Sequence, residues 1–134
     1  MGLFDFLLKK GDSQFVPEKE FDQNSDMQVH LAPIAMNNLR MLDIDDDSEL
    51  KVEFFFYTNT LEKAKTLSIE LEKLSYELYH YGECGFKKGL YSITGCTDKM
   101  KMSDNIVAKW AQDMCELGYI FDCEFDGWGT TPDQ

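Results

Sequence analysis

Apolar and polar residues alternate in a regular order from residue 51 onward, and this order predicts four strands and two helices. A period of two, which is typical of strands, recurs in four stretches: 51–58, 77–84, 90–97 and 119–125. Helical spacing of three and four fills two intervals between them: 60–75 and 104–117. Asn59 and Ser103 can cap these two helices, Glu62 can form a capping box with Asn59, and Gly118 can end the second helix.

The order strand, helix, strand, strand, helix, strand is that of two split βαβ units. We therefore predict an α+β fold, a ferredoxin-like βαββαβ sandwich in which both helices cover one face of a four-stranded antiparallel sheet. The first and third strands should be central, and the last should lie at an edge. In this last strand Phe121, Cys123 and Phe125 alternate with residues that we expect to point outward and to discourage edge-to-edge aggregation: Asp122, Glu124 and Asp126.

The N-terminal part of the chain has a weaker pattern. Residues 27–42 have helical spacing, with Pro33 near the start, where a helix tolerates it. Residues 11–26 are polar without an apolar period, which is typical of a linker, and the acidic run 43–49 lacks the glycine and glutamate of an EF-hand loop. We expect an N-terminal segment and linker over 1–26, and a domain over 27–134 that comprises a helix at 27–42 and the ferredoxin-like core at 51–130.

The first ten residues combine apolar side chains with Lys9 and Lys10. The run is far shorter than the roughly 20 apolar residues that a membrane span requires, so no span is predicted. We favour a frayed or docked start, and a short amphipathic helix that touches lipid remains the alternative.

The predicted sheet has two apolar faces but only two helices to cover one of them. Phe55 and Tyr57 should point away from those helices, together with Tyr79 and Tyr81 on the neighbouring edge strand. A bare aromatic face would be a sticky patch. Our hypothesis is that the helix at 27–42 packs over part of this face and that any aromatic surface left uncovered is a docking site.

The charge of the chain narrows the class of partner. The 134 residues suit one domain, and 43% apolar residues are enough for a core despite a net charge of −12. Affinity for nucleic acid comes from clustered Lys and Arg, and the aromatic third-strand motif of an RNA-recognition sheet is absent, so direct nucleic-acid binding is not expected. A protein partner with a basic surface is the better electrostatic prediction.

Cysteine and histidine, which often bind metals or act in catalysis, are few and scattered in this sequence. Four cysteines form no CxxC pair, and His30 and His80 are far apart, so we predict no metal site, no cofactor and no catalytic residues. We interpret the cysteines as reduced, mostly buried thiols of a cytoplasmic protein.

The closing stretch Phe125-Asp126-Gly127-Trp128-Gly129-Thr130 resembles a motif of the RraB family of ribonuclease E inhibitors. Two further stretches agree with that family: Leu61-Glu62-Lys63-Ala64 and Leu74-Ser75-Tyr76-Glu77, in which Ser75 stands where the family often has Gly. The resemblance covers residues 51–130. It implies a small, acidic, ferredoxin-like protein that is not an enzyme, binds ribonuclease E, alters the degradosome and so restrains RNA cleavage.

No catalytic residue is implied by the resemblance, so the candidate residues are those that could contact a protein partner: Asp122, Glu124, Asp126, Trp128, Phe55 and Tyr57. Trp is the residue type most enriched among binding hot spots. Asp126 and Trp128 could instead be structural, as a polar turn with the indole folded back over the sheet. The alternative function is an acidic protein-binding module of another kind, such as an immunity-type protein that neutralises a toxin.

Overall fold

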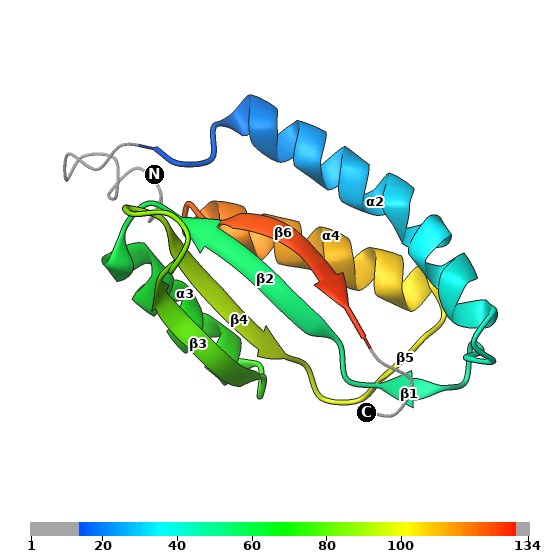
Figure 1. The fold of residues 1–134 in the computed structure, drawn as a ribbon. Coiled ribbons are helices and arrows are strands. Elements are labelled where there is room, and N and C mark those ends of the chain that lie inside the picture. Colours follow the sequence, from blue (N-terminus) through cyan, green and yellow to red (C-terminus); the bar gives the residue numbers. More distant parts are fainter. Residues whose placement is uncertain (1–13, 131–134) are drawn as a thin grey trace.

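A four-stranded antiparallel sheet with two helices on one face forms the centre of the computed structural model, which describes residues 14–130 (Figure 1). The strands lie in the order β3-β4-β2-β6, and all neighbours are antiparallel. Their bounds are β2 Glu53–Thr58, β3 Glu77–Glu83, β4 Tyr91–Cys96 and β6 Glu124–Gly129, and the two helices are α3 Leu61–Lys73 and α4 Asp104–Ile120. This is the predicted ferredoxin-like order, with β2 and β4 central and β6 at an edge.

The core lies between the sheet and these helices. In β2 the inward residues Phe54 and Phe56 are fully buried, as the period of two predicts. Each helix adds one apolar stripe to this core, and the stripes are Ala64, Leu67 and Leu71 in α3, and Val107, Ala111 and Met114 in α4. The side chain of Ser103 accepts a hydrogen bond from the Ile106 amide and caps α4 as predicted.

The ends of the helices differ from the prediction in two places. Thr60 rather than Asn59 caps α3, because its hydroxyl accepts a hydrogen bond from the amide of Lys63. Helix α4 does not end at Gly118 but continues to Ile120, so the last strand begins at Glu124 instead of residue 119. Gly118 allows close packing, since a Cβ there would lie 2.7 Å from the Cys123 carbonyl oxygen and 2.8 Å from the ring of Phe56.

The N-terminal part of the described chain forms one long helix, α2 (Glu18–Arg40). The predictions of a linker through residue 26 and of a helix start at residue 27 are therefore wrong. Residues 18–26 are helical rather than a linker, and Pro33 lies in the helix interior. The helix packs along α4 and beside β6, with Ala32, Met36 and Leu39 buried, and does not lie over the sheet face that carries Phe55 (Figure 1). The predictions for residues 1–13 lie outside the described residues.

Two short strands form a second sheet that the pattern of residues did not predict. β1 (Glu49–Leu50) pairs with β5 (Met100–Lys101) in antiparallel register. The acidic run before β1 is therefore only partly a solvated connection, because Ile44 within it is buried and Leu50 belongs to the core.

The end of α3 places Ser75 in a left-handed backbone conformation. Ser75 has a φ of 66°, and the amides of Ser75 and Tyr76 bond to the carbonyls of Glu72 and Leu71, which is the pattern of a Schellman motif. This left-handed conformation costs an L-residue conformational free energy, whereas glycine adopts it without steric strain.

We expect Ser75→Gly to raise the free energy of unfolding by about 0.5–1 kcal/mol, because the left-handed strain is relieved and only part of the gain is offset by unfolded-state entropy. Urea denaturation measures the change. Glu72→Gly, inside the helix, is the control and should lower stability. A loss of stability in Ser75→Gly would contradict this account of the helix end.

Candidate protein-binding surface

The face of the sheet opposite α3 and α4 is an open aromatic surface, which we call the open face. Phe55 and Tyr57 of β2 lie on it and are partly buried. Phe86, from the connection between β3 and β4, is 75% exposed and makes an edge contact with Tyr57 at a ring-centroid distance of 6.3 Å. Tyr79 of β3 is half exposed. Within residues 14–130, therefore, no helix covers this group of aromatic rings.

The phenol of Tyr79 interacts with Cys96 of the neighbouring strand β4. A hydrogen bond with the Cys96 side chain, together with loss of solvent, raises the pKa of Tyr79 to about 12. Cys96 is paired with Glu53 and lies on the open face, yet it is buried. The Tyr79 ring thus stays accessible beside a buried thiol of the open face.

The motif that carries the family resemblance forms a bulge in the edge strand. Phe125 lies opposite Phe56 and Trp128 lies opposite Phe54, so an extra residue stands between them and both side chains reach the same face. Gly127 has a φ of 134°, which a side chain rarely permits. The bulge places two aromatic side chains, three residues apart in β6, on the core side of the sheet.

Trp128 packs against α4 rather than standing free. Its ring meets that of Trp110 edge-on at 6.5 Å, and Trp110 meets Phe125 in the same way at 5.9 Å. The Trp110 indole also donates a hydrogen bond to the Tyr76 hydroxyl at 3.2 Å. The structural role foreseen for Trp128 agrees with this packing, although the motif is a bulged strand and not a turn after it.

Asp122 is not on the surface, which corrects the prediction that it points outward. Its carboxylate is 2.7 Å from the Lys63 ammonium, and both side chains are 2% exposed. The same carboxylate accepts hydrogen bonds from the amides of Phe15 and Val16 at 2.7 and 2.8 Å. Asp122 has a φ of 57° at the end of α4, so it is not part of an alternating strand. It holds the start of the described chain to the core and cannot contact a partner.

Glu124 and Asp126 follow the prediction in part, because Glu124 is partly buried and Asp126 is exposed. Burial raises the pKa of both carboxyl groups, and the neighbouring Asp126 charge raises that of Glu124 further. Both side chains line a hollow of about 300 Å³ between β6 and α2. Glu124 is paired with Tyr57 and lies beside the open face.

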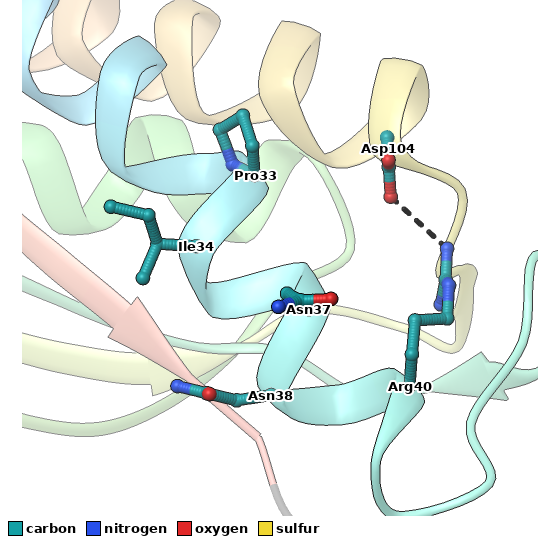
Figure 2. Close-up of a pocket in the computed structure, with 6 residues that line it drawn as sticks. All are labelled: Pro33, Ile34, Asn37, Asn38, Arg40 and Asp104. Carbon is teal, nitrogen blue, oxygen red and sulfur yellow. Dashed lines mark hydrogen bonds and ion pairs between the residues drawn. The ribbon is translucent and has the colours of Figure 1, made fainter.

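Another hollow, of about 310 Å³, lies beside the C-terminal half of α2. Figure 2 shows the residues that line it. Its one cation, Arg40, donates to the carboxylate of Asp104 and to the carbonyls of Ile44 and Met102. A further ion pair joins Arg40 to Asp46. Arg40 is thus a structural link between α2, the acidic loop and the start of α4, and the arrangement is not that of a binding centre.

The groups that could support catalysis do not converge. His30 lies on α2 and His80 on β3, and both are exposed. Within residues 14–130, no three His, Cys, Asp or Glu side chains are placed to hold a metal ion. None of the helices in that range combines the length and apolar character needed to cross a bilayer.

The cysteines are free thiols, and all four are buried: Cys84, Cys96, Cys115 and Cys123. Burial raises the pKa of Cys115 and of Cys123 to about 12. Because only a thiolate attacks a disulfide reagent, these two groups should be inert in the folded protein at pH 8.

We expect the native thiols Cys115 and Cys123 to react with Ellman's reagent on the order of a hundredfold more slowly than in guanidinium chloride. A thiol whose pKa is raised on folding stabilises the fold below its unfolded pKa, so stability should fall as pH rises from about 9 toward 12. Denaturation at pH 8 and pH 10.5 measures that loss. Immediate reaction of all four thiols in buffer would contradict the buried arrangement.

Comparison with known proteins agrees with the closing motif and the fold. The RraB family profile, described as regulator of ribonuclease activity B, matches residues 35–130. The match includes only residues 35–40 of α2 but the whole ferredoxin-like core, and it ends at Thr130. A search of curated proteins finds no match. Since the family profile spans most of its length, the chain belongs to the RraB family of regulators of ribonuclease activity.

Proposed function

We propose that this protein binds ribonuclease E, or a component of its complex, and restrains RNA cleavage in the cytoplasm without catalysing a reaction. Membership of a family of ribonuclease regulators supports a role in RNA turnover. The observation that carries a binding mechanism is the open face, where aromatic rings stay accessible in a chain that carries a net charge of −12.

The open face suits a protein partner better than a nucleic acid. Tyr and Phe are enriched where proteins meet, because they bury a large area with few rotatable bonds. The carboxylates of Glu53 and Glu77 lie on the same strands as the rings, and Glu124 lies on the neighbouring strand β6 opposite Tyr57, so all three would repel phosphates. They would attract a basic surface and speed its association at low salt.

Purified ribonuclease E from the same organism tests the proposal directly. The protein alone should leave a labelled RNA intact, and adding it to the enzyme should lower the cleavage rate in proportion to the complex formed. Binding should weaken as salt is raised from 50 to 300 mM, because exposed charges are screened. If calorimetry detects no complex and the cleavage rate is unchanged at saturating protein, the proposed function is wrong.

Variants of two exposed residues of the open face test whether the partner binds there. Phe86→Ala and Tyr79→Ala should each weaken the complex by about tenfold, since truncating an aromatic anchor commonly costs more than 1 kcal/mol. Ile69→Ala is the matched control, because Ile69 is similarly exposed but lies on α3 at the opposite side of the sheet. Equal affinity for all three variants would place the contact elsewhere on the molecule.

A further inference from the structure

Helix α2 and strand β6 run side by side along the edge of the sheet (Figure 1). Side chains from both elements line two hollows there. The hollow lined by Glu124 is followed along the edge by a second hollow of about 250 Å³, and Asp126 lines both. Met27 and Leu31 contribute apolar lining from α2, and Trp128 contributes it from β6. We call these two adjoining hollows together the α2–β6 groove.

Helix α2, which forms one wall of the groove, has an apolar stripe that faces solvent. α2 packs on α4 through Ala32, Met36 and Leu39. A second set of apolar side chains faces solvent: Met27, Leu31 and Ile34 of the helix, and Met41 directly after it. Their spacing of four, three and seven residues is that of the seam by which one helix packs against another. Each of the four is more than 40% exposed, so the stripe is a surface with space for a second helix.

The groove also has an acidic rim without a cation. Glu20, Glu124 and Asp126 line it, and the five ion pairs found among residues 14–130 involve other side chains. Burial and the neighbouring Asp126 charge raise the pKa of Glu124, so its ionised form lies in an unfavourable environment in this hollow. A positive charge brought by a partner would make that environment more favourable.

We propose that the α2–β6 groove binds an amphipathic helix of the protein partner, with its apolar side chains on Met27 and Leu31 and its Arg or Lys side chains at Glu124 and Asp126. This inference rests on the proposed function and adds to it a second contact region, separate from the rings of the open face, and the chemistry of the partner segment that binds there. Helix-in-groove binding uses anchors at the spacing that α2 presents. Arg is suited to the rim because its guanidinium bonds carboxylates in a fork geometry.

Two probes separate this inference from the proposed function. The first is ribonuclease E of the same organism, and the second is a synthetic amphipathic helix of about 18 residues built from Leu, Ala and Arg. The full chain should bind the peptide, and amide NMR signals of Met27, Leu31 and Gly127 should shift. A peptide in which Glu replaces Arg should not bind. Failure of the Arg peptide to shift these signals would overturn the groove assignment.

Charge reversal tests the rim. Glu124→Lys combined with Asp126→Lys should weaken peptide binding by at least about tenfold. The control, Glu62→Lys with Glu72→Lys on the exposed side of α3, changes the net charge equally and should alter affinity less than about twofold. Equal losses in the two variants would mean general attraction to an acidic protein and would overturn the proposal.

Truncating the apolar wall tests the stripe. Leu31→Ser should weaken binding about tenfold, and Ile69→Ser on α3 should not. If ribonuclease E binds the protein but neither Leu31→Ser nor the charge reversal affects it, the groove is wrong and the proposed function stands. If ribonuclease E never binds while the peptide does, the groove stands and the named partner is wrong.

Two other occupants would give different outcomes. Residues 1–10 also combine apolar side chains with two lysines, so Phe4→Ser with Phe6→Ser in the full chain should raise peptide affinity if that segment fills the groove. A second copy of the chain would give a dimer in sedimentation velocity that Leu31→Ser dissociates. Either result would overturn the assignment to a partner helix.

Discussion

Asp122→Asn should lower the free energy of unfolding by about 3–5 kcal/mol, the range observed when one partner of a buried ion pair is removed. The amide has nearly the same shape and tolerates the left-handed backbone at this position. The variant therefore isolates the charge, since it leaves the Lys63 ammonium buried at 2% exposure opposite a neutral group. Urea denaturation monitored by tryptophan fluorescence gives the change.

Three further variants make this result interpretable. Glu70→Ala breaks the exposed pair with Lys73 and should change stability by less than about 1 kcal/mol. Lys63→Met alone should be strongly destabilising, and combining it with Asp122→Asn should restore part of the loss because no buried charge is then unpaired. If the double variant loses the sum of the two single effects, the pair is not coupled and the interpretation is wrong.

Gly95→Ala is the second large effect, and we expect a loss of about 3 kcal/mol, at the upper end for an overpacked core. A Cβ at Gly95 would lie 2.2 Å from the carbonyl oxygen of Glu77 and 2.9 Å from the Phe54 ring. The first contact is with backbone, so a rotamer change cannot relieve it and β3 must move away from β4.

The control for Gly95→Ala is Gly85→Ala, because a Cβ at Gly85 would have no neighbour within 4 Å. That variant should change stability by less than about 0.5 kcal/mol. Hydrogen exchange adds a local readout: in Gly95→Ala the amides of β3 should exchange faster than those of β6. A variant that is as stable as the parent chain would show that the strands separate easily.

The sheet and its two helices were predictable because their buried apolar residues recur at regular spacing within each short segment. Phe54 and Phe56 alternate with residues of the other face, and Leu67 and Leu71 recur at helical spacing. The first turns of α2 were not predictable in this way, since Phe21 is fixed by stacking on Tyr119 at 4.3 Å, about a hundred residues away in sequence. Tertiary contacts, and not a local pattern, make this segment helical.

The candidate surface was predictable to a smaller degree. Phe55 and Tyr57 were placed correctly by the period of two, whereas Asp122 was misplaced because the alternation was extended into a helix end. Lys63 gave a signal that could have been used, since it lies on the apolar face of α3 one turn before Leu67, and a buried lysine needs an anion. Gly127 in a strand was a comparable sign of a bulge.

The two edges of the sheet have consequences for how the molecule can associate. On one side the Asn24 side chain donates a hydrogen bond to the Phe125 carbonyl of β6 at 2.8 Å, so α2 occupies part of the edge that another strand would need. On the other side, β3 is irregular between Leu78 and His80 and has exposed glutamates at both ends. Strand addition is thus discouraged at both margins, and a chain with this sheet can remain unpolymerised while its aromatic rings stay accessible to solvent.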